Sequence, residues 1–139
     1  MGRLNVMFGD TIGAPLRRFI KNVRSSLYRK LPVEYRQRSD STVEWRERFG
    51  EADFDRVGRF LRIYCGAFLF PESDAARLRP DDKPIEIYRM LHAHWPVDQM
   101  EFETFHLRLR REFSVDFTVD DFEHLSLGQM YQRIQKVAE

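Results

Sequence analysis

Apolar side chains recur every three or four residues in several segments of the chain, which is the spacing of an amphipathic helix. The first such segment begins after Gly13-Ala14-Pro15, where a proline suits the first turn of a helix, and it ends before Pro32. Its apolar face contains Leu16, Phe19, Ile20, Val23 and Leu27. Its other face contains Arg17, Arg18, Lys21 and Arg24. The pattern predicts a basic amphipathic helix near the N-terminus.

A polar stretch follows this helix. Residues 34–42 are rich in Arg, Gln, Ser and Asp, and they predict a linker or loop that buries little. Val43, Trp45 and Phe49 then predict a short helical turn, which Gly50 closes. The pattern becomes strongly periodic again only after this glycine.

A second helix is predicted from Asp53, whose carboxylate can accept hydrogen bonds from the amides of the first turn, to Pro71, which stops it. One apolar stripe marks this helix: Phe54, Val57, Leu61, Tyr64, Cys65 and Phe68. Residues 74–80 are polar and predict a loop. A short helix follows, with Ile85, Tyr88 and Leu91 as its apolar residues and with Trp95-Pro96 at its end.

The clearest helix is predicted from Asp98, where Asp98-Gln99-Met100-Glu101 has the form of a capping box. Its apolar positions are Phe102, Phe105, Leu109 and Phe113. Two more helices are predicted, a short one over residues 120–125 and a final one from Ser126. The final helix places Leu127, Met130, Tyr131 and Ile134 on its inner face. No segment requires a sheet, so the predicted fold class is all-α.

Composition limits the kinds of protein that this chain can be. A chain of 139 residues, 42% of them hydrophobic, has enough apolar surface for one domain with a core and an arm. Its single cysteine, Cys65, excludes an intrachain disulfide and a Cys-based zinc cluster. The chain has no apolar run of about 20 residues, which is the length that crosses a bilayer, and no signal-peptide core. We therefore expect a soluble cytoplasmic protein.

Charge is distributed unevenly along the chain. Residues 1–49 contain 11 Lys and Arg against 5 Asp and Glu, whereas residues 50–139 contain 12 against 17. We therefore divide the chain into a basic N-terminal arm, residues 1–49, and a helical domain, residues 50–139. Such a split indicates either an arm that binds an acidic partner or an arm that folds back on its own domain.

Several short motifs lie between Asp98 and about Ser126, at spacings that match one family of proteins without an inserted or deleted residue. They are Asp98-Gln99-Met100-Glu101, Arg110-Arg111-Glu112-Phe113, Ser114-Val115-Asp116-Phe117 and Asp120-Asp121-Phe122-Glu123-His124-Leu125. In this order they resemble the acyl carrier proteins, in which an Asp-Ser-Leu-Asp/Glu signature opens the second helix and Glu-Glu-Phe closes it. A weaker similarity extends back to Asp53. The resemblance implies an acyl-carrier-like four-helix bundle, here with an additional basic N-terminal amphipathic helix.

Gln99 stands where that family has its serine. The resemblance implies that the serine would be esterified by 4′-phosphopantetheine, whose thiol carries acyl groups. A carboxamide can neither act as the nucleophile nor supply the ester oxygen. We therefore expect no phosphopantetheine, no other cofactor, no metal and no enzymatic activity, and we expect a protein-interaction or regulatory module.

The resemblance also implies which surface meets a partner, because carrier domains present their second helix to partner enzymes. The expected partner-binding residues are Asp98, Gln99, Met100, Glu101, Glu103 and Arg108. The sequence identifies neither the protein partner nor any small-molecule substrate.

Two alternatives remain open. Asp40-Ser41-Thr42-Val43 also places a serine after an aspartate, so the chain could be a genuine acyl or peptidyl carrier whose attachment serine is Ser41. The basic arm could instead neutralise the phosphates of a nucleic acid or of an anionic membrane surface.

Other groups of reactive residues have structural interpretations that we favour. His92 and His94 lack the spacing of a helical metal-binding pair, and we expect them to cap the short helix. The adjacent acids Asp81-Asp82 and Asp120-Asp121 are typical of helix starts. Cys65 lies in an apolar stripe, where we expect it to be buried and inert.

Overall fold

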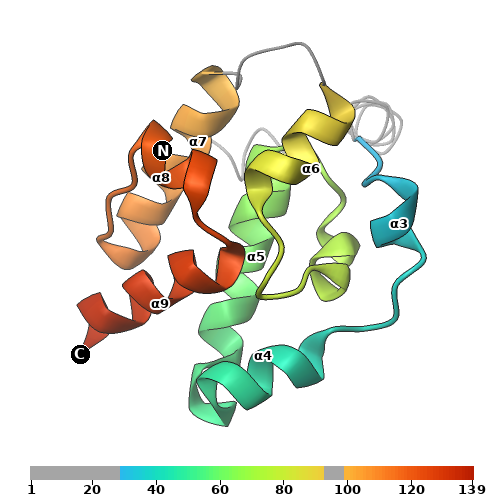
Figure 1. Ribbon diagram of the computed structural model, residues 1–139. Helices are drawn as coiled ribbons and strands as arrows, with labels where there is room; N and C mark the ends of the chain where they lie inside the picture. The colour runs from blue at the N-terminus through green and yellow to red at the C-terminus, as the bar shows by residue number, and fades with distance from the viewer. Residues whose placement is uncertain (1–28, 93–98) are drawn as a thin grey trace, which may run out of the picture.

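The computed structural model describes residues 29–92 and 99–139, and within them every regular element is a helix. The α-helices are α3 (Val33–Arg36), α4 (Thr42–Phe49), α5 (Phe54–Ala67), α6 (Pro84–Leu91), α7 (Gln99–Phe113), α8 (Val119–His124) and α9 (Leu127–Ala138), and the 3-10 helices are η1 (Glu51–Asp53) and η2 (Glu72–Arg77). Figure 1 shows α5 running through the middle of this arrangement. The predicted all-α class is therefore confirmed for the described part of the chain.

Some predictions concern residues outside the described ranges. The basic N-terminal helix with Arg17, Arg18, Lys21 and Arg24 is one of them, and Asp98 of the predicted capping box is another. Among the helices of residues 29–92 and 99–139, none has the length and apolar character needed to cross a membrane.

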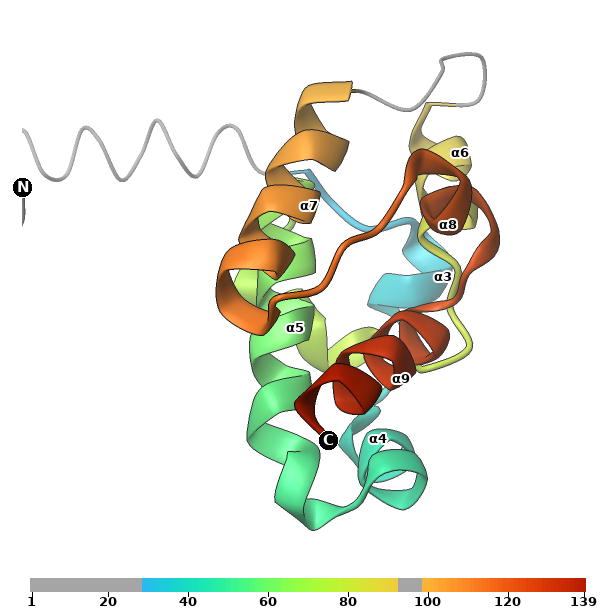
Figure 2. The ribbon, with the colours of Figure 1, turned by 90° about the vertical axis from the view of Figure 1, so that its left-hand side faces the viewer.

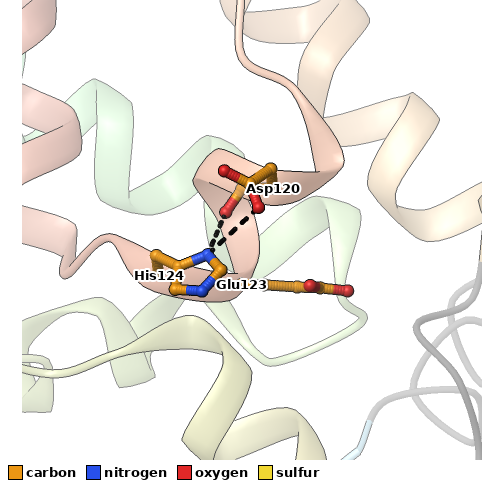
Figure 3. A group of neighbouring side chains, drawn as sticks. All are labelled: Asp120, Glu123 and His124. Atoms are coloured by element: carbon orange, nitrogen blue, oxygen red, sulfur yellow. Dashed lines mark hydrogen bonds and ion pairs between the residues drawn. The ribbon is translucent and has the colours of Figure 1, made fainter.

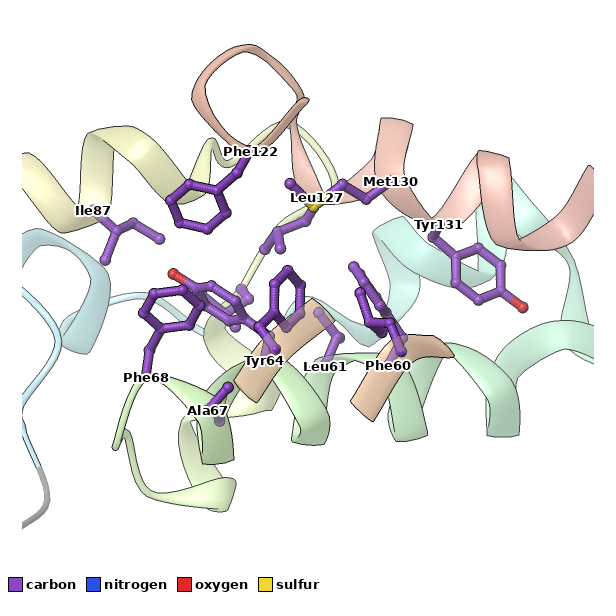
Figure 4. Packing of buried hydrophobic residues seen from close by; sticks show 14 of the residues in the cluster. Phe60, Leu61, Tyr64, Ala67, Phe68, Ile87, Phe122, Leu127, Met130 and Tyr131 are labelled. Atoms are coloured by element: carbon purple, nitrogen blue, oxygen red, sulfur yellow. The ribbon is translucent and has the colours of Figure 1, made fainter. Parts of the chain in front are cut away.

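Helix α5 lies at the centre of the core and is buried over much of its circumference. Its buried side chains are Val57, Phe60, Leu61, Tyr64, Cys65 and Ala67. Figure 4 shows several of them packed against residues of α8 and α9. The predicted stripe is confirmed, except that Phe54 is only half-buried and that Phe60, which the pattern missed, is 0% exposed.

Aromatic rings join α5 to the helices that follow it. Phe68, directly after α5, stacks on Phe122 of α8 with ring centroids 5.3 Å apart. Tyr64 meets Phe105 of α7 edge to face at 5.7 Å. Such pairs contribute about 0.5–1.5 kcal/mol each beyond the burial of their area. One aromatic cluster thus fixes the positions of α5, α7 and α8.

The segment before α4 is more buried than its polar composition predicts. Residues 34–42 were expected to bury little, but α3 extends into this segment, and Tyr35 and Ser41 are only 5% and 2% exposed. The Arg38 guanidinium lies 4.1 Å from the centre of the Tyr35 ring and binds Asp82, 2.6 Å away. The prediction is confirmed for the exposed residues Glu34, Arg36, Gln37, Ser39 and Asp40. It was wrong for Tyr35 and Ser41, because their burial depends on residues distant in the sequence.

Helix α4 confirms the predicted turn and extends it. Trp45 is buried, and its indole Nε1 donates a hydrogen bond to the carbonyl oxygen of Leu78 at 2.7 Å. Gly50 ends the helix with a φ of 88°, a conformation that favours glycine. Val43 points to solvent instead of the core. The division of the chain at residue 50 stays a prediction, although Trp45 belongs to the same core as α5.

Two of the acids that were predicted to cap helix starts, Asp53 and Asp82, bind other partners instead. The Asp53 carboxylate makes no capping hydrogen bond and instead accepts from the Tyr131 hydroxyl at 2.9 Å and from Gln135 at 3.1 Å. The Asp82 carboxylate accepts from the backbone N–H of Arg79 at 2.7 Å and does not cap α6. Both carboxylates therefore link separate elements, and the capping prediction was wrong for them.

The predicted loop over residues 74–80 is partly helical. It overlaps η2, and Leu78 is completely buried. Asp74 is also buried and pairs with Arg77 at 2.8 Å. Spacing alone missed this 3-10 turn, because such a short helix has no repeating apolar stripe.

The starts of α8 and α9 lie within one residue of where the sequence predicted them. Thr118 and Asp121 form a capping box at the start of α8, so the helix-start prediction is confirmed for Asp121. Ser126 and Gln129 form a second one at the start of α9. The predicted inward residues Leu127, Met130, Tyr131 and Ile134 are all buried.

Replacing Gly128 by alanine should destabilise the protein by about 1–3 kcal/mol. The Gly128 N–H donates to the Pro80 carbonyl oxygen at 2.7 Å, and an added Cβ would lie 2.8 Å from that oxygen. Urea unfolding of the two proteins measures the difference. Gly58→Ala is the matched control, since its Cβ would approach only the Arg62 side chain within 4 Å. Equal stability of Gly128→Ala and the wild type would contradict the close approach.

The Asp121 carboxylate should make stability depend on pH in the acidic range. Its hydrogen bonds with Arg133 and Thr118 lower the pKa of Asp121. A lowered folded-state pKa stabilises the fold above the unfolded value, about 3.9, and this contribution is lost as the pH falls through the folded value. The stability difference between the wild type and Asp121→Asn should therefore shrink below about pH 4. Urea unfolding at several pH values tests this, and a constant difference would contradict it.

Candidate functional site

One face of α7 is exposed along the whole helix. Met100, Glu103, Leu107 and Arg111 are three or four residues apart, Arg108 is adjacent to Leu107, and all five are exposed to solvent. Met100 is 78% exposed and Leu107 is 49% exposed, so two large apolar side chains lie among charged ones. The opposite face packs on α5, and Figure 2 shows the two helices side by side. This exposed face is the strongest candidate for contact with another protein.

Three of the six predicted partner-binding residues lie on this face. Gln99 is the first residue of α7, and Asp98 lies outside the described residues. Met100, Glu103 and Arg108 lie on the exposed face, as the sequence predicted. Glu101 does not, because it is 9% exposed and belongs to the opposite side of the helix.

Glu101 has a structural role at the start of α7. Its carboxylate accepts hydrogen bonds from both terminal nitrogens of the Arg29 guanidinium, one of them at 3.0 Å. The backbone N–H of Arg29 donates to the Leu69 carbonyl oxygen at 2.6 Å. Leu69 has a φ of 64°, a left-handed conformation that is uncommon for leucine. The first described residue of the chain is thus held beside the end of α5 and the start of α7.

A groove of about 420 Å³ lies between α4, α5 and η2. Its apolar lining comes from all three elements: Trp45, Phe54, Val57, Leu61, Ala75 and Ala76. The charged side chains that line it are Asp55, Arg59, Arg62 and Glu72. No pattern in the sequence indicates this groove, because its walls come from three separate segments that no single period connects.

A second depression, of about 240 Å³, lies between α5 and α7. Arg59, Arg62 and Glu72 line both hollows, so the second depression continues the first. Arg108 and Glu112 of α7 complete it. Arg59 binds Glu112 at 2.6 Å, whereas Arg62 and Arg108 have no ion pair with any residue in ranges 29–92 and 99–139.

Two glycines of α5 let these arginines lie close to the helix. A Cβ at Gly66 would be 2.9 Å from a terminal nitrogen of Arg108, and a Cβ at Gly58 would be 3.2 Å from one of Arg62. Both guanidinium groups therefore rest against the α5 surface. They can donate to an anion there without first breaking an ion pair within the described residues.

The candidate nucleophiles of the described residues are buried. Cys65 is completely buried, as predicted, and burial raises the pKa of its thiol to about 12. The Ser41 side chain is also buried, at the residue before α4, and its backbone N–H donates to the Ala76 carbonyl oxygen at 2.7 Å. Neither side chain is presented to solvent.

The histidines have structural contacts as well. The His92 N–H donates to the Tyr88 carbonyl oxygen at 2.8 Å at the end of α6, which agrees with the predicted capping position, whereas His94 lies outside the described residues. Figure 3 shows His124 beside Asp120 and Glu123, whose ligand atoms all lie within 4.8 Å of one another. These three side chains are exposed, and the His124 Nδ1 already lies 2.8 Å from the Asp120 carbonyl oxygen. These side chains lie together because all three belong to the short helix α8.

No protein-family model, no curated protein and no solved structure matches this chain. The resemblance to acyl carrier proteins therefore stays a prediction based on the motifs between Asp98 and Ser126.

Cys65 should resist alkylation in the folded protein. A buried thiol with a pKa of about 12 contains very little thiolate at neutral pH, and thiolate is the reactive form. Iodoacetamide should therefore label Cys65 only after unfolding in urea, and mass spectrometry counts the label. Rapid labelling of the folded protein would contradict this burial.

Proposed function

We propose that this protein is a non-enzymatic interaction module with an acyl-carrier-like helical bundle, and that it binds a protein partner through the exposed face of α7. The observation that carries the proposal is the exposure of Met100 and Leu107 among charged residues on one helix face. Exposed apolar side chains surrounded by polar ones are typical of interaction surfaces.

The order of the helices supports the acyl-carrier-like part of the proposal. The long helix α5 is followed by η2 and α6, then by α7, the short α8 and α9. The motifs that resemble the carrier family fall at the start and end of α7 and across α8. In that family the helix corresponding to α7 is the one that meets partners.

The side chain at position 99 is the reason for proposing a module without phosphopantetheine. A carboxamide lacks the hydroxyl that would form the phosphodiester. The alternative attachment residue, Ser41, is only 2% exposed, so a transferase could reach its hydroxyl only if the segment before α4 opened. These two observations favour an interaction role over acyl transfer.

Removing the apolar groups of the α7 face should abolish partner binding and leave the fold unchanged. We expect a Met100→Ser, Leu107→Ser variant to lose the proteins that the full-length wild type retains in affinity purification, since desolvated apolar anchors dominate most interfaces. Val137→Ser is the matched control, because Val137 is 52% exposed on α9, away from this face. Identical protein profiles for all three forms would overturn the proposal.

The same preparation tests the carrier alternative. After incubation with a phosphopantetheinyl transferase and coenzyme A, the intact mass of the wild type should not change. A gain of one phosphopantetheine group would identify the chain as a carrier. Retained proteins that are lost at high salt, but not in the α7 variant, would instead indicate electrostatic binding through the N-terminal arm.

A further inference from the structure

We propose that the groove between α4, α5 and η2 binds a long-chain carboxylate. The alkyl chain lies in the apolar groove, and the carboxylate lies between Arg62 and Arg108 in the adjoining depression. This site shares Arg108 with the exposed face of α7 but does not include Met100 or Leu107, and it does not depend on the function proposed for that face.

The apolar part of the site suits an alkyl chain in size and in chemistry. Its volume of about 420 Å³ lies in the range of small-molecule sites. Trp45 is only 2% exposed, and its indole N–H donates to Leu78, so the ring leaves no unsatisfied donor in the lining. The accessible apolar surface comes from half-buried residues, namely Phe54, Ala75 and Ala76. Apart from the charged residues and the Trp45 N–H, the polar side chains of the lining are the hydroxyl groups of Thr42 and Ser73.

This lining favours an alkyl chain over a peptide segment. A peptide would bring backbone N–H and carbonyl groups into the groove, and burying such groups without hydrogen bonds is unfavourable. An alkyl chain has no polar groups and carries no such cost. Each buried CH₂ group contributes favourably to binding instead.

The charges of the depression fit a single negative head group. The ion pair between Arg59 and Glu112 leaves Arg62 and Arg108 against Glu72, which is an excess of one positive charge. The terminal nitrogens of these two arginines lie beside Gly58 and Gly66, about 12 Å apart along α5, so the flexible side chains swing toward the carboxylate to donate hydrogen bonds to it. This excess is the reason for choosing a monocarboxylate over a cationic or neutral amphiphile.

The charges along α5 also define the direction of the ligand. Asp55 lines the groove, whereas a terminal nitrogen of Arg108 lies beside Gly66, eleven residues further along α5, which is about three helical turns, or roughly 16 Å. A carboxylate is repelled at the Asp55 end and attracted at the Arg108 end. The chain therefore extends from the depression toward α4.

Trp45 provides a direct measurement of binding. In the full chain carrying Trp95→Phe, Trp45 is the remaining tryptophan, and its fluorescence can be followed during titration with dodecanoate below its micelle concentration. We expect a saturable change with dodecanoate, about tenfold weaker binding of dodecanol, and no saturable change with dodecyltrimethylammonium. Equal affinity for all three amphiphiles would overturn the proposal.

Variants separate the contributions of the two halves of the site. Gly58→Leu should fill the groove and abolish binding, and circular dichroism checks that the helices remain. Arg62→Gln together with Arg108→Gln should weaken dodecanoate binding at least about tenfold and leave dodecanol binding unchanged. Arg111→Gln is the matched control, since Arg111 is exposed on α7 and does not line either hollow.

Other occupants of the groove give different results. If an acidic peptide with apolar residues changes Trp45 fluorescence and dodecanoate does not, the groove is a protein-docking site and the proposal is wrong. If the wild type dimerises in sedimentation and Gly58→Leu does not, the groove belongs to a second copy, and the proposal is again wrong. Neither result would change what the Met100→Ser, Leu107→Ser variant shows about partner binding through α7.

Discussion

The structure depends on the burial of α5 on two sides at once. One side faces the aromatic rings of α7 and α8, and the other side faces α4 and η2. A fully buried side chain of the size of Leu or Phe contributes about 1.5–3 kcal/mol relative to an exposed one. Neither half of the chain could bury this helix alone. Leu31, Tyr35 and Trp45, which precede α5 in the chain, therefore complete the core.

Buried carboxylates then fix how these pieces fit together. Asp53 joins the start of α5 to Tyr131 of α9, Asp82 joins the segment before α6 to Arg38, and Glu101 joins α7 to Arg29. A buried carboxylate is costly unless its oxygens accept hydrogen bonds, so each of these contacts demands one geometry. Burial and the hydrogen bond from Tyr131 to Asp53 raise the pKa of the Tyr131 phenol, which keeps it a donor. These contacts specify the packing of helices whose apolar surfaces alone would tolerate several arrangements.

The sequence predicted those parts of the fold that follow from local spacing. Helices α5, α7 and α9 have apolar residues every three or four positions, and Thr118 and Ser126 have capping partners three residues later. The errors occur where residues far apart in the chain decide the outcome. Asp53 and Asp82 have the local context of helix caps, yet partners on other elements bind their carboxylates. Tyr35 lies in a polar stretch and is buried only because other elements close over it.

The two candidate sites also differ in whether local spacing in the sequence can predict them. The exposed face of α7 is visible in the sequence, because the spacing that buries Phe102 and Phe105 necessarily exposes Glu103 and Leu107 on the other side. The groove is not visible, because it exists only once three elements meet. The contribution of Glu101 was also misjudged, since the spacing of one helix cannot show that Arg29 lies beside it.

The glycines of the protein indicate why the groove remains open. Packing requires a glycine at position 128, because the Pro80 carbonyl oxygen leaves no room for a side chain. The requirement is weaker at Gly58, because a Cβ there would lie 3.2 Å from the end of the flexible Arg62 side chain, whereas a glycine inside a helix costs about 1 kcal/mol relative to alanine. With Ala75 and Ala76 on the opposite wall, the small residues leave apolar surface that one larger side chain would cover. A sequence arranged for stability alone would fill this space, whereas a sequence that binds an alkyl chain must keep it.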